Sequence, residues 1–176
     1  MKKYTFILMT VIFTGFLFHC GTGDKINVTE ENISAPGSGT GTAIKGVQED
    51  LNCDKRDNDG ATQYIRAARF GKRDQMAKWL ALGCDVNAVD NYGWTALTWA
   101  SSKGFVDASK DIITAGGKID VPDRNSATPL MYAAGNGHKD IVQLLLAKGA
   151  NKSLRSKAGY RAADYATNDD IKALVQ

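Results

Sequence analysis

Apolar and polar positions recur with a period of 33 residues through the C-terminal two thirds of the chain. The segments Asp57–Val89, Asp90–Pro122 and Asp123–Arg155 align without a gap, and a shortened fourth copy occupies residues 156–176. Small or apolar residues match in all three full copies at several positions: Ala67, Ala100 and Ala133; Gly71, Gly104 and Gly137; Leu80, Ile113 and Leu146; Gly83, Gly116 and Gly149. One such unit cannot bury both of its faces alone, so the period predicts a stack of units.

Within each copy the pattern predicts two short helices. Thr62, Thr95 and Thr128 each precede a helical pattern, and we expect their hydroxyls to accept hydrogen bonds from the first backbone N–H groups. In the third copy Pro129 then occupies the first helical position, where its missing N–H does no harm. That helix ends near Gly137. A second helix follows and ends at Gly149, and its apolar face consists of Ile141, Val142, Leu144, Leu145 and Leu146.

The third copy carries the residues of a known repeat. The runs Thr128–Ala134, Gly137-His138, Ile141–Leu145 and Gly149–Asn151 closely match the pattern of the ankyrin repeat, which the chain resembles over about residues 52–176. The resemblance implies an all-α solenoid of helix–turn–helix units with β-hairpin loops, with about three full repeats plus partial caps. The end copies depart from the pattern through Gln63, Arg66 and Gln75 in the first and Arg161 in the last, as the exposed ends of a stack require.

The first 19 residues have the pattern of a signal peptide. Lys2 and Lys3 precede the uncharged, mostly apolar run Tyr4–Phe18, which is short for the ~30 Å hydrocarbon layer of a membrane. The sequence Leu17-Phe18-His19-Cys20 resembles a bacterial lipoprotein signal, which implies cleavage before Cys20 and lipidation of its thiol. An ordinary cleaved signal peptide or an uncleaved anchor is the alternative, because Phe18 and His19 stand where lipoprotein signals have small residues.

The polar, glycine-rich residues 20–51 are typical of a flexible tether between the lipid and the folded domain. Together, leader and tether imply a protein of the bacterial cell envelope that is anchored in a membrane and faces the periplasm or the surface.

Charge and histidine content exclude several function classes. The chain has 22 basic and 19 acidic residues, and the mature part, without Lys2 and Lys3, has a net charge of +1. A near-neutral mature protein lacks the basic surface that nucleic acid requires. The only histidines are His19 and His138, so a multi-histidine metal site is excluded. His138 occupies the Gly-His position of the resembled repeat, where the imidazole makes local hydrogen bonds. We therefore expect neither an enzyme nor a cofactor or metal.

Two cysteines, Cys53 and Cys84, lie in the folded part. In an exported protein they would meet an oxidising environment, in which two thiols can form a disulfide. Such a bridge would contribute about 3 kcal/mol of stability and would secure the weak N-terminal cap. The alternative is that they are two unrelated small residues, since Cys84 stands where the repeat commonly has Ala.

The resemblance also implies a recognition face, formed by the hairpin tips and the first helices. Tyr92 and Trp94, with basic neighbours, are of the types enriched at binding hot spots. Packing between repeats is the alternative for both, and we expect Trp99 and Tyr132 in the core. The residues carried over as protein-binding candidates are Arg69, Phe70, Tyr92, Trp94, Lys103, Arg124, Asn125, Asn136 and Tyr160.

The sequence thus favours a non-enzymatic protein–protein interaction module, monomeric and lipid-anchored, that presents a concave face to another protein. The alternatives are a periplasmic accessory factor for a redox or metal enzyme, acting through Cys53 and Cys84, and a secreted effector that acts on a host.

Overall fold

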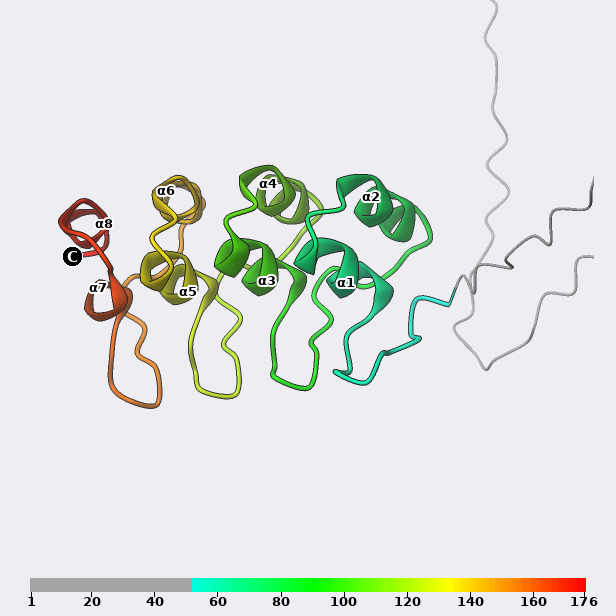
Figure 1. Cartoon of the computed structure of the whole chain (residues 1–176), viewed down its shortest axis with the longest axis horizontal. Helices are drawn as coiled ribbons and strands as arrows, with labels where there is room; N and C mark the ends of the chain where they lie inside the picture. Colours follow the sequence, from blue (N-terminus) through cyan, green and yellow to red (C-terminus); the bar gives the residue numbers. More distant parts are fainter. Residues whose placement is uncertain (1–51) are drawn as a thin grey trace, which may run out of the picture. The chain divides into compact units, whose positions relative to one another are not determined.

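The computed structural model describes residues 52–176. The predicted signal peptide, the lipidation at Cys20 and the tether therefore lie outside the described residues. The described part contains helices in consecutive pairs (Figure 1), with these bounds: α1 Gln63–Arg69, α2 Arg73–Ala81, α3 Ala96–Lys103, α4 Val106–Thr114, α5 Pro129–Gly135, α6 Lys139–Ala147, α7 Ala162–Tyr165 and α8 Asp169–Val175.

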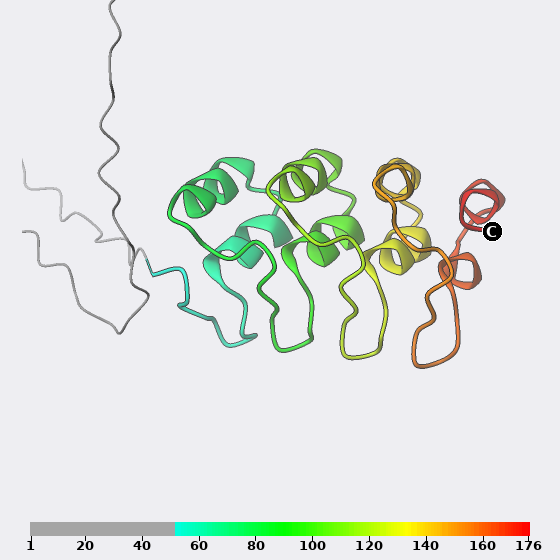
Figure 2. The same ribbon diagram turned by 180° about the vertical axis from the view of Figure 1, so that it is seen from behind.

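The helices form two layers with the hairpin loops on one side. Helices α1, α3, α5 and α7 pack in sequence to form an inner row, while α2, α4, α6 and α8 form an outer row behind them. The loops that enter each inner helix extend in the same direction, which both views show (Figures 1 and 2). Because every unit packs mainly on its neighbours, this arrangement is a helical solenoid. The predicted all-α solenoid of stacked helix pairs is confirmed.

Small residues allow the inner helices to approach one another. Ala100 and Ala133 are completely buried, and Ala67 nearly so. Larger core side chains come from both rows: Ile65 and Leu130 of the inner helices are buried, as are Ile112, Ile141 and Leu145 of the outer helices. Within residues 52–176, none of the helices is long and apolar enough to cross a bilayer.

The threonine caps differ between repeats. The Thr62 hydroxyl accepts from the N–H of Ile65 at 3.3 Å, and the Thr95 hydroxyl accepts from the N–H of Thr98 at 3.1 Å. The expectation for Thr128 is wrong, because its hydroxyl is buried and has no hydrogen-bond partner within the described residues. Here Pro129 occupies the start of α5, and its ring constrains φ to the helical range.

Each hairpin needs one residue with positive φ, at the position that Gly60, Gly93 and Gly159 occupy. In the third repeat this residue is Ser126, with φ of 58°. The hairpin shape is therefore retained even where glycine, which adopts this conformation most readily, is replaced.

A disulfide joins Cys53 to Cys84, with their Cα atoms 5.1 Å apart. It connects the segment before the first hairpin to the residues that follow α2. The structure thus contains the pairing that the sequence analysis left open, and the bridge links the segment that precedes the first repeat to that repeat.

Candidate functional site

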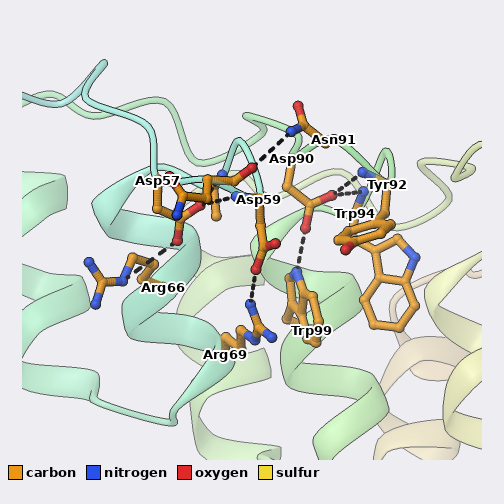
Figure 3. A network of polar contacts seen from close by, with 11 residues as sticks. Asp57, Asp59, Arg66, Arg69, Asp90, Asn91, Tyr92, Trp94 and Trp99 are labelled. Carbon is orange, nitrogen blue, oxygen red and sulfur yellow. Dashed lines mark hydrogen bonds and ion pairs between the residues drawn. The ribbon is translucent and has the colours of Figure 1, made fainter.

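A carboxylate at the same repeat position organises each of the first three hairpins. Asp90 Oδ1 accepts from the backbone N–H groups of Tyr92 and Trp94, both at 2.9 Å (Figure 3). Asp123 Oδ1 accepts in the same way from Asn125 and Ala127, both at 2.8 Å. Asp57 repeats the arrangement in the first hairpin. An aspartate that bonds its own backbone two residues further on stabilises a turn.

The second oxygen of each carboxylate faces a side chain nine residues further along, on the inner helix. Asp90 Oδ2 accepts from Trp99 Nε1 at 2.8 Å, and Asp123 Oδ2 accepts from the Tyr132 hydroxyl at 2.6 Å. In the first repeat the partner of Asp57 is Arg66, with 3.8 Å between Nε and Oδ2 (Figure 3). The hairpins are thereby bound to the inner helices by side chains as well as by backbone.

The Tyr132 hydroxyl is held in its protonated form. Burial raises its pKa most, and the hydrogen bond to Asp123 and the charge of that carboxylate raise it further. Tyr132 therefore acts as a constant hydrogen-bond donor to Asp123.

Neighbouring hairpins are also joined to one another through their tips. Asn91 donates its N–H to the carbonyl of Asp59 at 2.9 Å, and Arg124 donates to Tyr92 at 3.2 Å. Lys157 donates to Asn125 at 2.8 Å, which continues the row into the fourth repeat. A face whose backbone is fixed in this way loses little conformational entropy when it binds a partner.

Three aromatic rings cluster between the second and third repeats. The ring of Trp94 packs against those of Trp99 and Tyr132, with centroids 4.4 Å apart in both pairs. The guanidinium of Arg69 lies 4.3 Å from the centroid of Trp99 and 3.0 Å from Asp59. Both the tilted ring pairs and the cation over an indole are stabilising contacts. Trp94 thus packs between repeats, as the alternative interpretation held, while Tyr92 is 53% exposed.

Two adjacent hollows lie on the face formed by the hairpins and the inner helices. The first has a volume of about 450 Å³ and is lined by Tyr92, Trp94, Trp99, Asp123, Arg124, Asn125 and Tyr132. The second, of about 460 Å³, shares Asn125 and Tyr132 and adds Ala127, Met131, Gly135, Asn136, Ser156, Lys157, Ala158 and Tyr165. We call the two hollows together the hairpin groove.

The model for ankyrin repeats (3 copies) matches residues 41–123, 64–156 and 104–175. The chain belongs to the ankyrin-repeat family. This family is generally a non-catalytic protein-interaction fold, so the hairpin groove lies on a protein-binding scaffold.

Similar ankyrin regions occur in much larger eukaryotic proteins. The chain is 33% identical to BCL-6 corepressor-like protein 1 of Homo sapiens over 119 residues, which cover 67% of this chain and 7% of that protein. It is 32% identical to SMC5-SMC6 complex localization factor protein 1 of Homo sapiens over 130 residues, or 72% of this chain and 12% of that protein. Putative palmitoyltransferase ZDHHC13 of Danio rerio is 36% identical over 99 residues, or 55% of this chain and 15% of that protein. The chain thus spans a small part of each relative.

The structure distributes the nine candidate residues over the ankyrin face unevenly. Tyr92, Trp94, Arg124, Asn125 and Asn136 line the hairpin groove. Arg69 and Phe70 line a separate hollow of about 340 Å³ in the first repeat. Lys103 is exposed at the end of α3. Tyr160 is 54% exposed and packs edge-on against Tyr165, with 5.8 Å between the ring centroids.

The expectation that Trp99 and Tyr132 belong to the core needs correction. Both pack against the core but are only half-buried, and both line the groove. Their indole N–H and hydroxyl bond the hairpin carboxylates, which keeps the polar ends of the side chains near the surface. Sequence reasoning missed one signal: Trp99 follows Asp90 by nine residues, and Tyr132 follows Asp123 by the same spacing.

His138 makes a contact between repeats rather than the local hydrogen bond expected. Its Nε2 lies 3.1 Å from the carbonyl oxygen of Ser102 in the preceding repeat. Among residues 52–176, no three His, Cys, Asp or Glu side chains are grouped so that they could hold a metal ion.

Proposed function

We propose that this chain is a non-enzymatic interaction module that binds a partner protein through the hairpin groove. The observation that carries the proposal is that exposed Tyr92 and the aromatic cluster behind it line a hollow on a face whose backbone is fixed in advance. Exposed aromatic and basic side chains around such a hollow have the composition of a binding hot spot. The domain acts as a monomer.

Capture of partners from the solubilised cell envelope with the tagged full chain tests this function. Tyr92→Ala removes an exposed ring from the groove while leaving the Trp94 packing intact, and we expect the partner to be lost. The matched control is Tyr160→Ala, since Tyr160 is equally exposed but does not line either hollow. A partner retained equally by both variants, with unchanged circular dichroism, would place the binding site elsewhere.

We further propose that the module is tethered to a bacterial membrane by a lipid on Cys20. The support is the Leu17–Cys20 pattern after an apolar run, together with a Cys53–Cys84 disulfide of the kind that persists in exported proteins. Metabolic labelling with a fatty acid tests the anchor. We expect label on the full chain and none on Cys20→Ser, whereas an unlabelled wild-type chain in the soluble fraction would refute the anchor.

A further inference from the structure

We infer that the segment bound in the hairpin groove is an extended acidic peptide that carries an apolar side chain. This inference rests on the proposed function and specifies the chemistry of the partner. It follows from the charges around the groove, from the bonds that the groove's own carboxylates already make, and from the apolar surfaces that line its hollows.

The cations at and beside the groove have no acidic partner in the part of the chain that the structure describes. Arg124 lines the first hollow and Lys157 lines the second, and both are exposed. Lys103 is also exposed, at the repeat position that Asn136 occupies in the second hollow. Within residues 52–176, none of these three side chains forms an ion pair.

The carboxylates on the same face already accept hydrogen bonds or form an ion pair within the protein. Asp90 and Asp123 are 5% and 8% exposed, and both oxygens of each accept hydrogen bonds from the protein. Asp164 accepts from the backbone N–H of Arg161 at 2.7 Å and lies beside its guanidinium. Because these negative charges face inward or are paired, the positive charge of the rim is what an approaching partner meets.

The two faces of repeats two to four differ in charge. Residues 90–104, 123–137 and 156–165, which form the hairpins and inner helices, contain four cations and three carboxylates. The outer helices α4, α6 and α8 contain three cations and five carboxylates. An acidic segment is therefore attracted to the inner face and repelled from the outer one, even though the mature chain as a whole has a net charge of only +1.

The lining of the groove suits a peptide rather than a small cation. Both ring contacts of Trp94 are internal, to Trp99 and Tyr132, and Arg69 already lies over Trp99, so the aromatic rings form no cage for a positive charge. Tyr92 and Tyr165 offer ring surface in successive hollows, and the exposed Asn125, which lines both hollows, has a side-chain amide that can bond a peptide backbone. An extended chain that advances ~3.3 Å per residue would span both hollows with a handful of residues.

Selection of phage-displayed random peptides on the immobilised full chain at low salt tests this inference. We expect the enriched peptides to carry Asp and Glu around a Leu, Ile, Phe or Met. For a synthetic copy of an enriched peptide, Arg124→Glu with Lys157→Glu should raise Kd at least about tenfold, and high salt should reduce this difference because it screens exposed charges. The matched control is Lys118→Glu with Lys148→Glu, which changes the net charge equally at exposed positions outside both hollows.

The outcomes separate this inference from the proposed function. Uncharged or basic peptides that lose binding with Tyr92→Ala would overturn the acidic chemistry and leave the groove as the binding site. Acidic peptides that bind Tyr92→Ala and the charge-reversed chain as tightly as the wild type would overturn both. Tighter binding of an oligothymidylate than of any selected peptide would overturn the assignment to a peptide. If no peptide is enriched, the inference fails, while capture of whole proteins still decides the proposed function.

Discussion

The first and third repeats have the same chain path but are stabilised by different means. In the third, Asp123 joins a half-buried network that includes Tyr132 and Trp94, and α6 buries Ile141, Val142 and Leu145. In the first, the equivalent Asp57 faces Arg66 at 3.8 Å, and α2 buries only Met76 and Trp79. The first repeat instead carries the disulfide. A terminal unit has a neighbour on one side only, so a covalent link replaces the packing that an internal unit receives from two sides.

Removing the disulfide should have the largest effect on stability, and this effect should be confined to the first repeat. We expect Cys53→Ser with Cys84→Ser to lower the free energy of unfolding by about 3 kcal/mol, because the reduced chain gains conformational freedom in the unfolded state. Hydrogen exchange should show the loss of protection in α1 and α2 and little change in α5 and α6. A reducing agent added to the double variant is the control and should have no further effect. Equal loss of protection in all repeats would contradict a locally acting link.

The hairpin carboxylates should differ in importance between the two repeats. Asp123→Ala should lower the free energy of unfolding by about 2 kcal/mol, because it leaves buried N–H groups and the Tyr132 hydroxyl without an acceptor. Asp57→Ala should cost about half as much, since its second oxygen faces only the exposed Arg66. Urea denaturation of the two variants measures both values. Equal losses would show that the turn bonds alone, and not the contact to the inner helix, determine the cost.

The second repeat can be made more like the other two at one buried position. Ser101 is completely buried and its hydroxyl has no partner within the described residues, whereas the first and third repeats have Ala68 and Ala134 there. Ser101→Ala should raise the free energy of unfolding by about 1 kcal/mol, because it removes an unsatisfied buried hydroxyl at little change in volume. Thermal and urea denaturation test this gain. A loss of stability would show that a buried water satisfies the hydroxyl.

The smallest expected effect concerns the ion pairs between outer helices. Arg73 holds Asp111 through two hydrogen bonds, at 2.6 and 3.1 Å, which lower the pKa of that carboxyl. A carboxyl with a lowered pKa in the folded state adds stability above its ordinary pKa, and this contribution disappears as the pH falls through the lowered value. Arg73→Gln should therefore return the Asp111 pKa towards its ordinary value, which NMR titration measures.

The equivalent pair at the other end provides the control for this change. Lys139 lies 2.8 Å from Asp170 and lowers its pKa. Arg73→Gln should leave the Asp170 titration unchanged, because an exposed charge in the first repeat is screened over that distance. A change in the pKa values of both carboxyls would indicate that the outer helices are energetically coupled.

Much of the fold could be predicted because each repeat has its own residues that start helices and form turns. Pro129, the capping threonines Thr62 and Thr95, and the recurring glycines predict where helices and turns begin and end. Thr128 was the exception, since its sequence position is the same but its hydroxyl is buried and finds no hydrogen-bond partner among residues 52–176. Whether a side chain makes a cap bond depends on its rotamer in the packed protein as well as on its position.

The site was harder to predict than the fold. Sequence reasoning selected Tyr92, Trp94 and Arg124 for the inner face but assigned Trp99 and Tyr132 to the core. It also treated Arg69 and Phe70 as part of the same surface, although they line a separate hollow. These errors share a cause, because the period identifies equivalent positions but does not show how unequal side chains from neighbouring repeats fill the space between them.

The sequence alone determined the solenoid, its 33-residue unit and the polar character of its ends, because each unit carries its own turn and helix signals. Tertiary structure alone decided the pairing of Cys53 with Cys84, the bonds from each aspartate to the inner helix, and the division of the inner face into hollows. These features depend on distances between side chains from different elements or different repeats, and such distances exist only once the units have stacked.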